Sequence, residues 1–173
     1  MAMSLMRTGM IPLISEAEIQ EMVQDLAKEI ERDYDGRELV MVCPLKGSIS
    51  FFADLVRRIQ LPQQIEFVQV TSPKGEGCRI IKDISSDIKG KHVLIVEEII
   101  DAGRTLSFLK TRLLASEPAS CKIVALLDKP ARRELPIRPD YVGTTIDDRF
   151  VIGYGMDSDE VGRNYKDIYN YAQ

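Results

Sequence analysis

The sequence is most informative at residues 93–106, which read Val-Leu-Ile-Val-Glu-Glu-Ile-Ile-Asp-Ala-Gly-Arg-Thr-Leu. The first four residues are aliphatic without alternation, which is typical of a parallel strand that is covered on both faces. Glu97 and Glu98 end this apolar run, and Asp101 follows in a short turn before leucines at helical spacing. Because ligands of open α/β sheets bind outside the carboxyl ends of the strands, this stretch predicts a binding site at that edge.

The turn itself has the features of a phosphate-binding loop. Gly103 permits a tight turn, and the backbone N–H groups of residues 102–106 can then point at one anion, aided by the helix dipole. Carboxylates beside such a loop suit a sugar phosphate bound with magnesium, which prefers oxygen ligands and often bridges carboxylates and phosphates. The alternative is a solvated acidic edge followed by an ordinary capped helix. The complete ordered pattern favours the binding site.

The stretch resembles the signature of the type I phosphoribosyltransferases, in which four apolar residues, two acids and two apolar residues precede Asp-Thr-Gly-x-Thr. Glu98 stands where Asp is usual, and Ala102 stands where Thr is usual. The resemblance implies that the two adjacent acids orient the ribose hydroxyls and bind Mg²⁺. The residues that it assigns to the ribose and its 5′-phosphate are Glu97, Glu98, Asp101, Ala102, Gly103, Arg104 and Thr105.

A second loop, Leu45-Lys46-Gly47, lies between a predicted strand and a predicted helix. On its own it is an ordinary connection. With the Phe-Phe-Ala-Asp-Leu of residues 51–55 behind it, it resembles the pyrophosphate loop of hypoxanthine-guanine phosphoribosyltransferases, in which the peptide at Leu45–Lys46 can be cis. The resemblance implies that Lys46 and Gly47 hold pyrophosphate and that Arg163 reaches the same group.

Four later residues match the purine site of that family. Lys129 would donate to the 6-oxo group, and because an ammonium has donors only, it favours a carbonyl over an amino group at position 6. Phe150 would stack on the purine, the Val151 backbone would contact its Watson–Crick edge, and Asp157 would bind a second Mg²⁺. Taken alone, Lys129 would be read as a solvated lysine before a turn. For Phe150 the alternative is a core aromatic at a strand start, and for Asp157 it is a helix cap or turn residue.

The order of the expected elements predicts an α/β fold with an open, mainly parallel twisted sheet flanked by helices. The expected strands are 39–43, 65–71, 79–84, 93–96, 122–127, 141–146 and 150–154. The expected helices are 15–32, 49–59 and 106–114. The resemblance implies a single domain over residues 1–173, with a small hood formed by the chain termini and a flexible lid at 71–78. Residues 1–14 are expected to be loosely ordered.

Composition narrows the class of protein. A formal net charge of −4 argues against a nucleic-acid surface, which would show a basic stripe. No window approaches 18 apolar residues and residues 1–12 lack a signal-peptide core, so we expect no membrane partner. Three widely spaced cysteines suit a reducing cytoplasm. A homodimer or homotetramer is expected from the resemblance alone.

The resemblance implies purine salvage, in which a 6-oxopurine and 5-phosphoribosyl 1-diphosphate give IMP or GMP and pyrophosphate. Asp101 would be the catalytic residue, either as a base toward purine N7 or as an electrostatic stabiliser of the N7–H, and both roles stay open. A xanthine- or guanine-preferring enzyme is one alternative. A non-catalytic RNA-binding regulator, as in the pyrimidine-operon attenuation proteins, is another, although the acidic charge and the presence of Asp101, Lys129 and Asp157 favour the enzyme.

Overall fold

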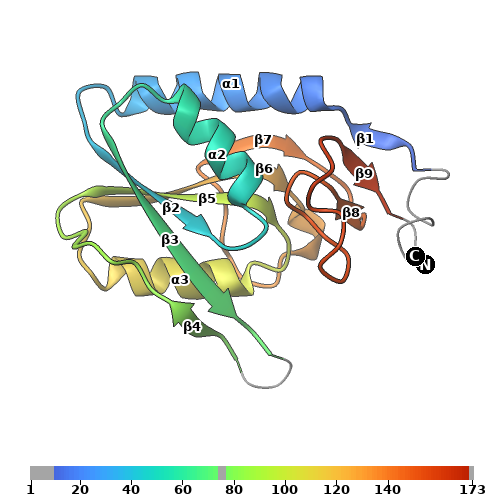
Figure 1. Cartoon of the computed structure of the whole chain (residues 1–173). Coiled ribbons are helices and arrows are strands. Elements are labelled where there is room, and N and C mark those ends of the chain that lie inside the picture. Colours follow the sequence, from blue (N-terminus) through green and yellow to red (C-terminus); the bar gives the residue numbers. More distant parts are fainter. Residues whose placement is uncertain (1–9, 74–76, 172–173) are drawn as a thin grey trace.

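The computed structural model describes residues 10–73 and 77–171 and is built around a six-stranded sheet of order β4-β3-β2-β5-β6-β7 (Figure 1). All neighbouring strands are parallel except β4, which runs antiparallel to β3. The strands are β2 (Leu39–Pro44), β3 (Gln63–Thr71), β4 (Arg79–Lys82), β5 (His92–Ile100), β6 (Ser120–Asp128) and β7 (Tyr141–Thr145). The expected open, mainly parallel α/β sheet is confirmed.

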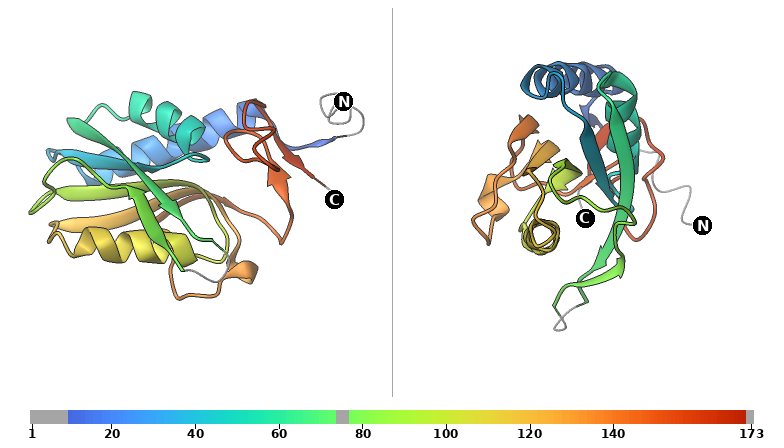
Figure 2. Two further views of the ribbon diagram at one scale, coloured as in Figure 1. Left: turned by 60° about the horizontal axis from the view of Figure 1, so that its bottom comes forward. Right: turned by 90° about the vertical axis from the view of Figure 1, so that its left-hand side faces the viewer.

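Helices cover both faces of this sheet (Figures 1 and 2). They are α1 (Glu16–Asp33), α2 (Ile49–Arg58) and α3 (Arg104–Leu114), and a 3-10 turn spans Pro130–Arg132. Alternate residues of each central strand point to opposite faces, so that Leu94 packs with α1 and α2 while Ile95 packs with α3. This two-sided burial explains why the central strands read as continuous apolar runs. None of the helices in the described ranges is long and apolar enough to cross a membrane.

Strand β5 is longer than the sequence suggested. Glu97 lies opposite Ala125, and the pairing with β6 continues as far as Ile100 opposite Asp128. The two acids therefore lie inside the strand near its carboxyl end, and not after it. In the helix that follows, Leu106, Leu109 and Leu113 are buried, whereas Leu114 is half exposed.

A second, three-stranded antiparallel sheet joins the two ends of the chain at the carboxyl edge of the central sheet (Figures 1 and 2). Its strands, in the order β1-β9-β8, are β1 (Pro12–Ile14), β9 (Ile168–Asn170) and β8 (Val151–Ile152). The expectation of a loose N-terminus is wrong for residues 12–14, which pair with β9. The expected strand 150–154 is also wrong beyond Ile152, because the next three residues have positive φ.

The connection between β3 and β4 is the segment where the sequence suggested a lid. The two expected strands on either side of it are present as β3 and β4, and they pair antiparallel. Residues 74–76 lie outside the described part of the chain, so the lid at 71–78 stays a prediction. Ser72, just before this gap, lines the cavity described next.

Candidate active site

Two neighbouring cavities lie at the carboxyl edge of the sheet. The larger, of about 470 Å³, is lined by the loop after β2, the end of β5, the start of α3 and the segment after β8. The smaller, of about 170 Å³, is lined by Lys129, Phe150 and Val151 among others. The residues that line both cavities are Glu98, Ile99, Asp101 and Asp157. Every site residue named from the sequence lines one cavity or both.

The floor of the larger cavity carries an acidic pair held by one serine. Ser48 is fully buried, and its hydroxyl contacts Glu97 at 3.2 Å and also contacts Glu98. Burial, followed by the charge of Glu98, raises the pKa of Glu97 well above its usual range, and burial also raises the pKa of Glu98. Two half-buried carboxylates with raised pKa values favour a nearby cation, which would stabilise their ionised forms.

The start of α3 forms one wall of the cavity. Gly103 is the N-cap with φ of +83°, and no side chain caps the helix, so the first N–H groups of α3 have no intrahelical or capping acceptor. A Cβ at Gly103 would lie 2.5 Å from the Ile137 side chain, so only glycine fits there. Free N–H groups at the positive end of a helix dipole are suited to a phosphate.

The loop after β2 packs closely against the acidic pair and against the C-terminal loop, by which we mean residues 153–167. The Leu45–Lys46 peptide is cis. A Cβ on Gly47 would lie 2.0 Å from Oε1 of Glu98, and a Cβ on Gly155 would lie 1.9 Å from the Gly47 carbonyl oxygen. Glycine at both positions therefore lets three segments meet at one point of the cavity.

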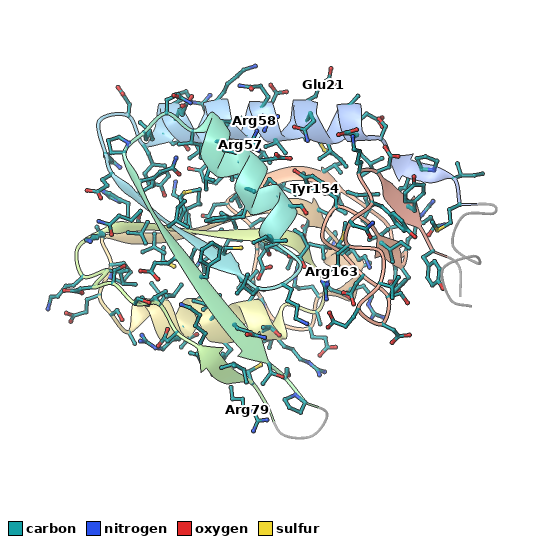
Figure 3. The ribbon with its side chains drawn as sticks, viewed as in Figure 1. Glu21, Arg57, Arg58, Arg79, Tyr154 and Arg163 are labelled. Carbon is teal, nitrogen blue, oxygen red and sulfur yellow. The ribbon has the colours of Figure 1, made fainter. Side chains whose placement is uncertain are left out.

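The C-terminal loop brings Asp157 and Arg163 to the cavity, and Figure 3 shows Arg163 on this loop below Tyr154. Nη2 of Arg163 lies 2.9 Å from Oδ1 of Asp157, and its Nη1 donates to the Gly155 carbonyl at 2.8 Å. The Tyr154 hydroxyl donates to Asp54 of α2 at 2.6 Å. The loop is thus tied both to itself and to the helix that follows the Lys46 loop.

The smaller cavity combines an aromatic ring, a cation and a carboxylate. Lys129 is 6% exposed, and its backbone N–H donates to the Ile100 carbonyl. Phe150 is 43% exposed and lines this cavity, and its ring also contacts that of Tyr171, with the ring centroids 5.9 Å apart. Asp101 lies between the two cavities, with Oδ1 at 3.1 Å from Nε of Arg132.

The sequence of this chain matches a known protein family. Residues 15–159 match the phosphoribosyl transferase domain. The chain belongs to the phosphoribosyltransferase family. The family resemblance stated from the sequence is therefore confirmed.

Among its relatives in this family, the hypoxanthine phosphoribosyltransferase of Haemophilus influenzae is 47% identical over 161 residues, which are 88% of this chain and 89% of that protein. The bifunctional protein TilS/HprT of Listeria innocua is 43% identical over 158 residues, which are 88% of this chain but only 24% of that protein. The crystal structure of a hypoxanthine-guanine phosphoribosyltransferase from Bacillus anthracis, with a HEPES molecule in its active site, has a TM-score of 0.91 at 42% identity. The match covers 94% of this chain and 98% of that chain.

Sequence reasoning missed three residues of this phosphoribosyltransferase site. Ser48 stands at the start of α2, where a serine is typical of a helix N-cap, so the sequence does not indicate its contacts with Glu97 and Glu98. Glu160, whose carboxylate reaches Lys46, and Arg132, which pairs with Asp101, gave no signal at all. Their partners lie far away in the sequence and only the fold brings them together.

Proposed function

We propose that this chain transfers the 5-phosphoribosyl group of 5-phosphoribosyl 1-diphosphate to hypoxanthine or guanine, giving IMP or GMP and pyrophosphate in purine salvage. The observation that carries the proposal is the pair of adjoining cavities. They share Glu98, Ile99, Asp101 and Asp157, so a base in the smaller cavity would face a ribose in the larger one. The names of the relatives support the choice of base.

The base would bind between the aromatic ring and the cation of the smaller cavity. Phe150 would stack on the purine face and Lys129 would donate to the 6-oxo group, while the Val151 backbone would contact the Watson–Crick edge. Lysine in this position has no acceptor for an exocyclic amino group, so adenine would leave buried donors unpaired and bind poorly.

The phosphoribosyl donor would occupy the larger cavity. The free N–H groups at the start of α3 would bind the 5′-phosphate, with Thr105 and Arg104 beside it. Lys46, Gly47 and Arg163 would bind the pyrophosphate on the other side. The ribose would then lie over the acidic pair.

The acidic pair and Asp157 fit the oxygen ligands of magnesium. Burial raises the pKa of Glu97 and of Glu98, and a divalent cation would favour their charged forms. Within residues 10–73 and 77–171 no group of three or more His, Cys, Asp or Glu side chains is suited to hold a metal by itself. Magnesium commonly takes one or two carboxylates together with substrate phosphates, and when bound it would supply positive charge against the pyrophosphate.

Asp101 would act at the reacting base. As the bond from the ribosyl carbon to pyrophosphate breaks and the bond to the purine nitrogen forms, positive charge develops on the purine, and its N7 proton becomes acidic. A carboxylate between the two cavities can accept this proton or stabilise the N7–H. Lys46, Gly47 and Arg163 would stabilise the negative charge of the departing pyrophosphate.

We further propose a cytoplasmic enzyme that forms a homodimer or homotetramer and binds neither nucleic acid nor membrane. The free cysteines Cys43, Cys78 and Cys121 and the net charge of −4 support the compartment and the absence of nucleic acid. The oligomer rests on the resemblance.

The experiment is a steady-state assay of the purified chain with hypoxanthine, guanine, xanthine or adenine, each with 5-phosphoribosyl 1-diphosphate, with and without Mg²⁺. We expect turnover with hypoxanthine or guanine, little with adenine, and loss of activity when the metal is chelated. The proposal would be contradicted if none of the four bases were turned over, or if adenine were preferred.

A further inference from the structure

Glu160 occupies the space between two cations that we assign to pyrophosphate. Nζ of Lys46 donates to Oε2 of Glu160 at 2.9 Å, and Nη2 of Arg163 lies 3.4 Å from the same oxygen. Lys46 belongs to the loop after β2, whereas Arg163 belongs to the C-terminal loop. One carboxylate oxygen therefore bridges the two sides of the larger cavity.

The backbone presents this carboxylate in an unusual conformation. Glu160 has φ of +66° and follows Asp159 at +50°. Two consecutive non-glycine residues in this region carry a conformational cost, which persists only where the surroundings hold it. Its backbone N–H donates to Oδ2 of Asp157 at 2.8 Å, so the position of Glu160 is tied to a predicted metal ligand.

The contact is exchangeable, and its arginine is not fully hydrogen-bonded. The Glu160 side chain is 64% exposed and the Lys46 side chain is 56% exposed, so the carboxylate can leave for solvent. Nε of Arg163 is buried and has no hydrogen-bond partner in the described chain. Arginine and lysine bind phosphate oxygens through the same charge-assisted hydrogen bonds that they make with carboxylates.

We propose that Glu160 is an internal competitor of pyrophosphate. In the free enzyme its carboxylate holds Lys46 and Arg163 together, it is displaced when the pyrophosphate group binds, and it returns when pyrophosphate leaves. The inference rests on the proposed pyrophosphate site. Its consequence is that Glu160 weakens product binding and so favours product release.

The test measures binding of inorganic pyrophosphate with Mg²⁺ to the free enzyme by titration calorimetry. Glu160→Gln keeps the length of the side chain but removes its charge, and we expect it to bind pyrophosphate about three- to tenfold more tightly, the range given by the loss of one exposed and one partly buried ion pair. Product inhibition by pyrophosphate should strengthen by the same factor. The Michaelis constant for hypoxanthine should not change.

Two variants serve as controls. Asp159→Asn removes the same charge from the adjacent residue, which makes no ion pair within the described chain, and should change the affinity less than twofold. Glu117→Gln removes a glutamate that also has positive φ and also pairs with a lysine, Lys89, away from the cavity; it should have no effect.

Three results would overturn the proposal. Glu160→Gln could bind pyrophosphate no more tightly than the parent, or Asp159→Asn could tighten binding equally, which would indicate general repulsion instead of competition. If the parent and all variants fail to bind pyrophosphate while the enzyme still turns over, the assignment of Lys46 and Arg163 is wrong as well. Failure of turnover with every base would instead refute the proposed function.

Discussion

Two walls of the larger cavity differ in whether their charged side chains form ion pairs. We call the part of the lining formed by residues 97–106 the β5 wall. On this wall, Glu97 and Glu98 share one serine hydroxyl and make no ion pair within the described residues. On the wall formed by the C-terminal loop, Asp157 pairs with Arg163, and Glu160 pairs with Lys46. The acidic pair has no cationic partner among the described residues, while the two carboxylates of the C-terminal loop are paired, one with Arg163 of the same loop and one with Lys46 of the loop after β2.

This difference indicates two ways of preparing a polar site. Burial raises the pKa of both carboxylates of the acidic pair, so their ionised forms are disfavoured relative to solution. A bound cation would favour these ionised forms. In the C-terminal loop Asp157 and Glu160 already pair with cations, so a ligand there has to replace contacts that already exist. The predictions below test each wall and the contacts between them.

The largest effect is expected at Asp101, at the end of the β5 wall. Asp101→Asn should lower kcat by about 10²-fold or more, the usual scale of general acid–base effects. Asp148→Asn is a matched control, because Asp148 also faces Arg132, at 3.6 Å, but lines neither cavity. Steady-state rates would show the contrast, and a parent-like rate for Asp101→Asn would refute its catalytic role.

The next effect concerns the point where the walls meet. Gly47→Ala adds a Cβ that would lie 2.0 Å from Oε1 of Glu98, so the acidic pair must move. Since overpacking costs about 1–3 kcal/mol, we expect kcat/KM for the phosphoribosyl donor to fall about tenfold or more.

Gly143→Ala provides the control for this clash. Its Cβ would lie 2.6 Å from the Leu126 carbonyl oxygen in the sheet, away from the cavity. It should lower the melting temperature without a selective effect on the donor. If both variants lose only stability, close approach at Gly47 does not serve the site.

A smaller effect is expected at Tyr154, which ties the C-terminal loop to α2. Tyr154→Phe removes the hydrogen bond to Asp54 and leaves a half-buried acceptor with fewer donors, at a cost of about 1–3 kcal/mol in stability. We also expect a severalfold rise in KM for the donor with little change in KM for hypoxanthine. The lost bond connects the C-terminal loop, which carries Arg163, to the helix that follows the Lys46 loop.

Tyr141→Phe breaks a similar bond, from Tyr141 to Asp33 at 2.9 Å, on β7 and the end of α1, and neither residue lines the two cavities. It should cost similar stability and leave both Michaelis constants unchanged. Thermal unfolding and initial rates on the two variants separate support of the site from support of the fold. Equal kinetics for both variants would contradict a positioning role for Tyr154.

The same contrast explains what could be predicted from the sequence. The β5 wall is one contiguous stretch, in which an apolar strand, two acids and a glycine turn follow each other, so its elements and their order were predictable. The strand predicted at 93–96 is too short, because two adjacent acids are typical of a strand end. In the structure Ile99 and Ile100 continue the pairing with β6.

The C-terminal loop could not be predicted in the same way. Its shape depends on positive φ at non-glycine residues such as Tyr154 and Glu160, which no propensity favours. Its contacts join residues 100 or more positions apart, such as Tyr154 with Asp54 and Glu160 with Lys46. The short strands β1, β9 and β8 likewise form through pairing between distant segments, with β9 between the other two.

The smallest effect is expected at Ala102, in the phosphate loop of the β5 wall. A threonine hydroxyl there would add one donor to the phosphate that we propose is bound by the N–H groups at the start of α3. A neutral hydrogen bond contributes about 1 kcal/mol, so Ala102→Thr should lower KM for the donor up to about fivefold. Ala102→Val has nearly the same shape without the hydroxyl and should give no gain, so initial rates over a range of donor concentration separate hydrogen bonding from shape. If both variants raise KM, the loop at Ala102 has no room for a larger side chain, and the phosphate is bound by backbone groups alone.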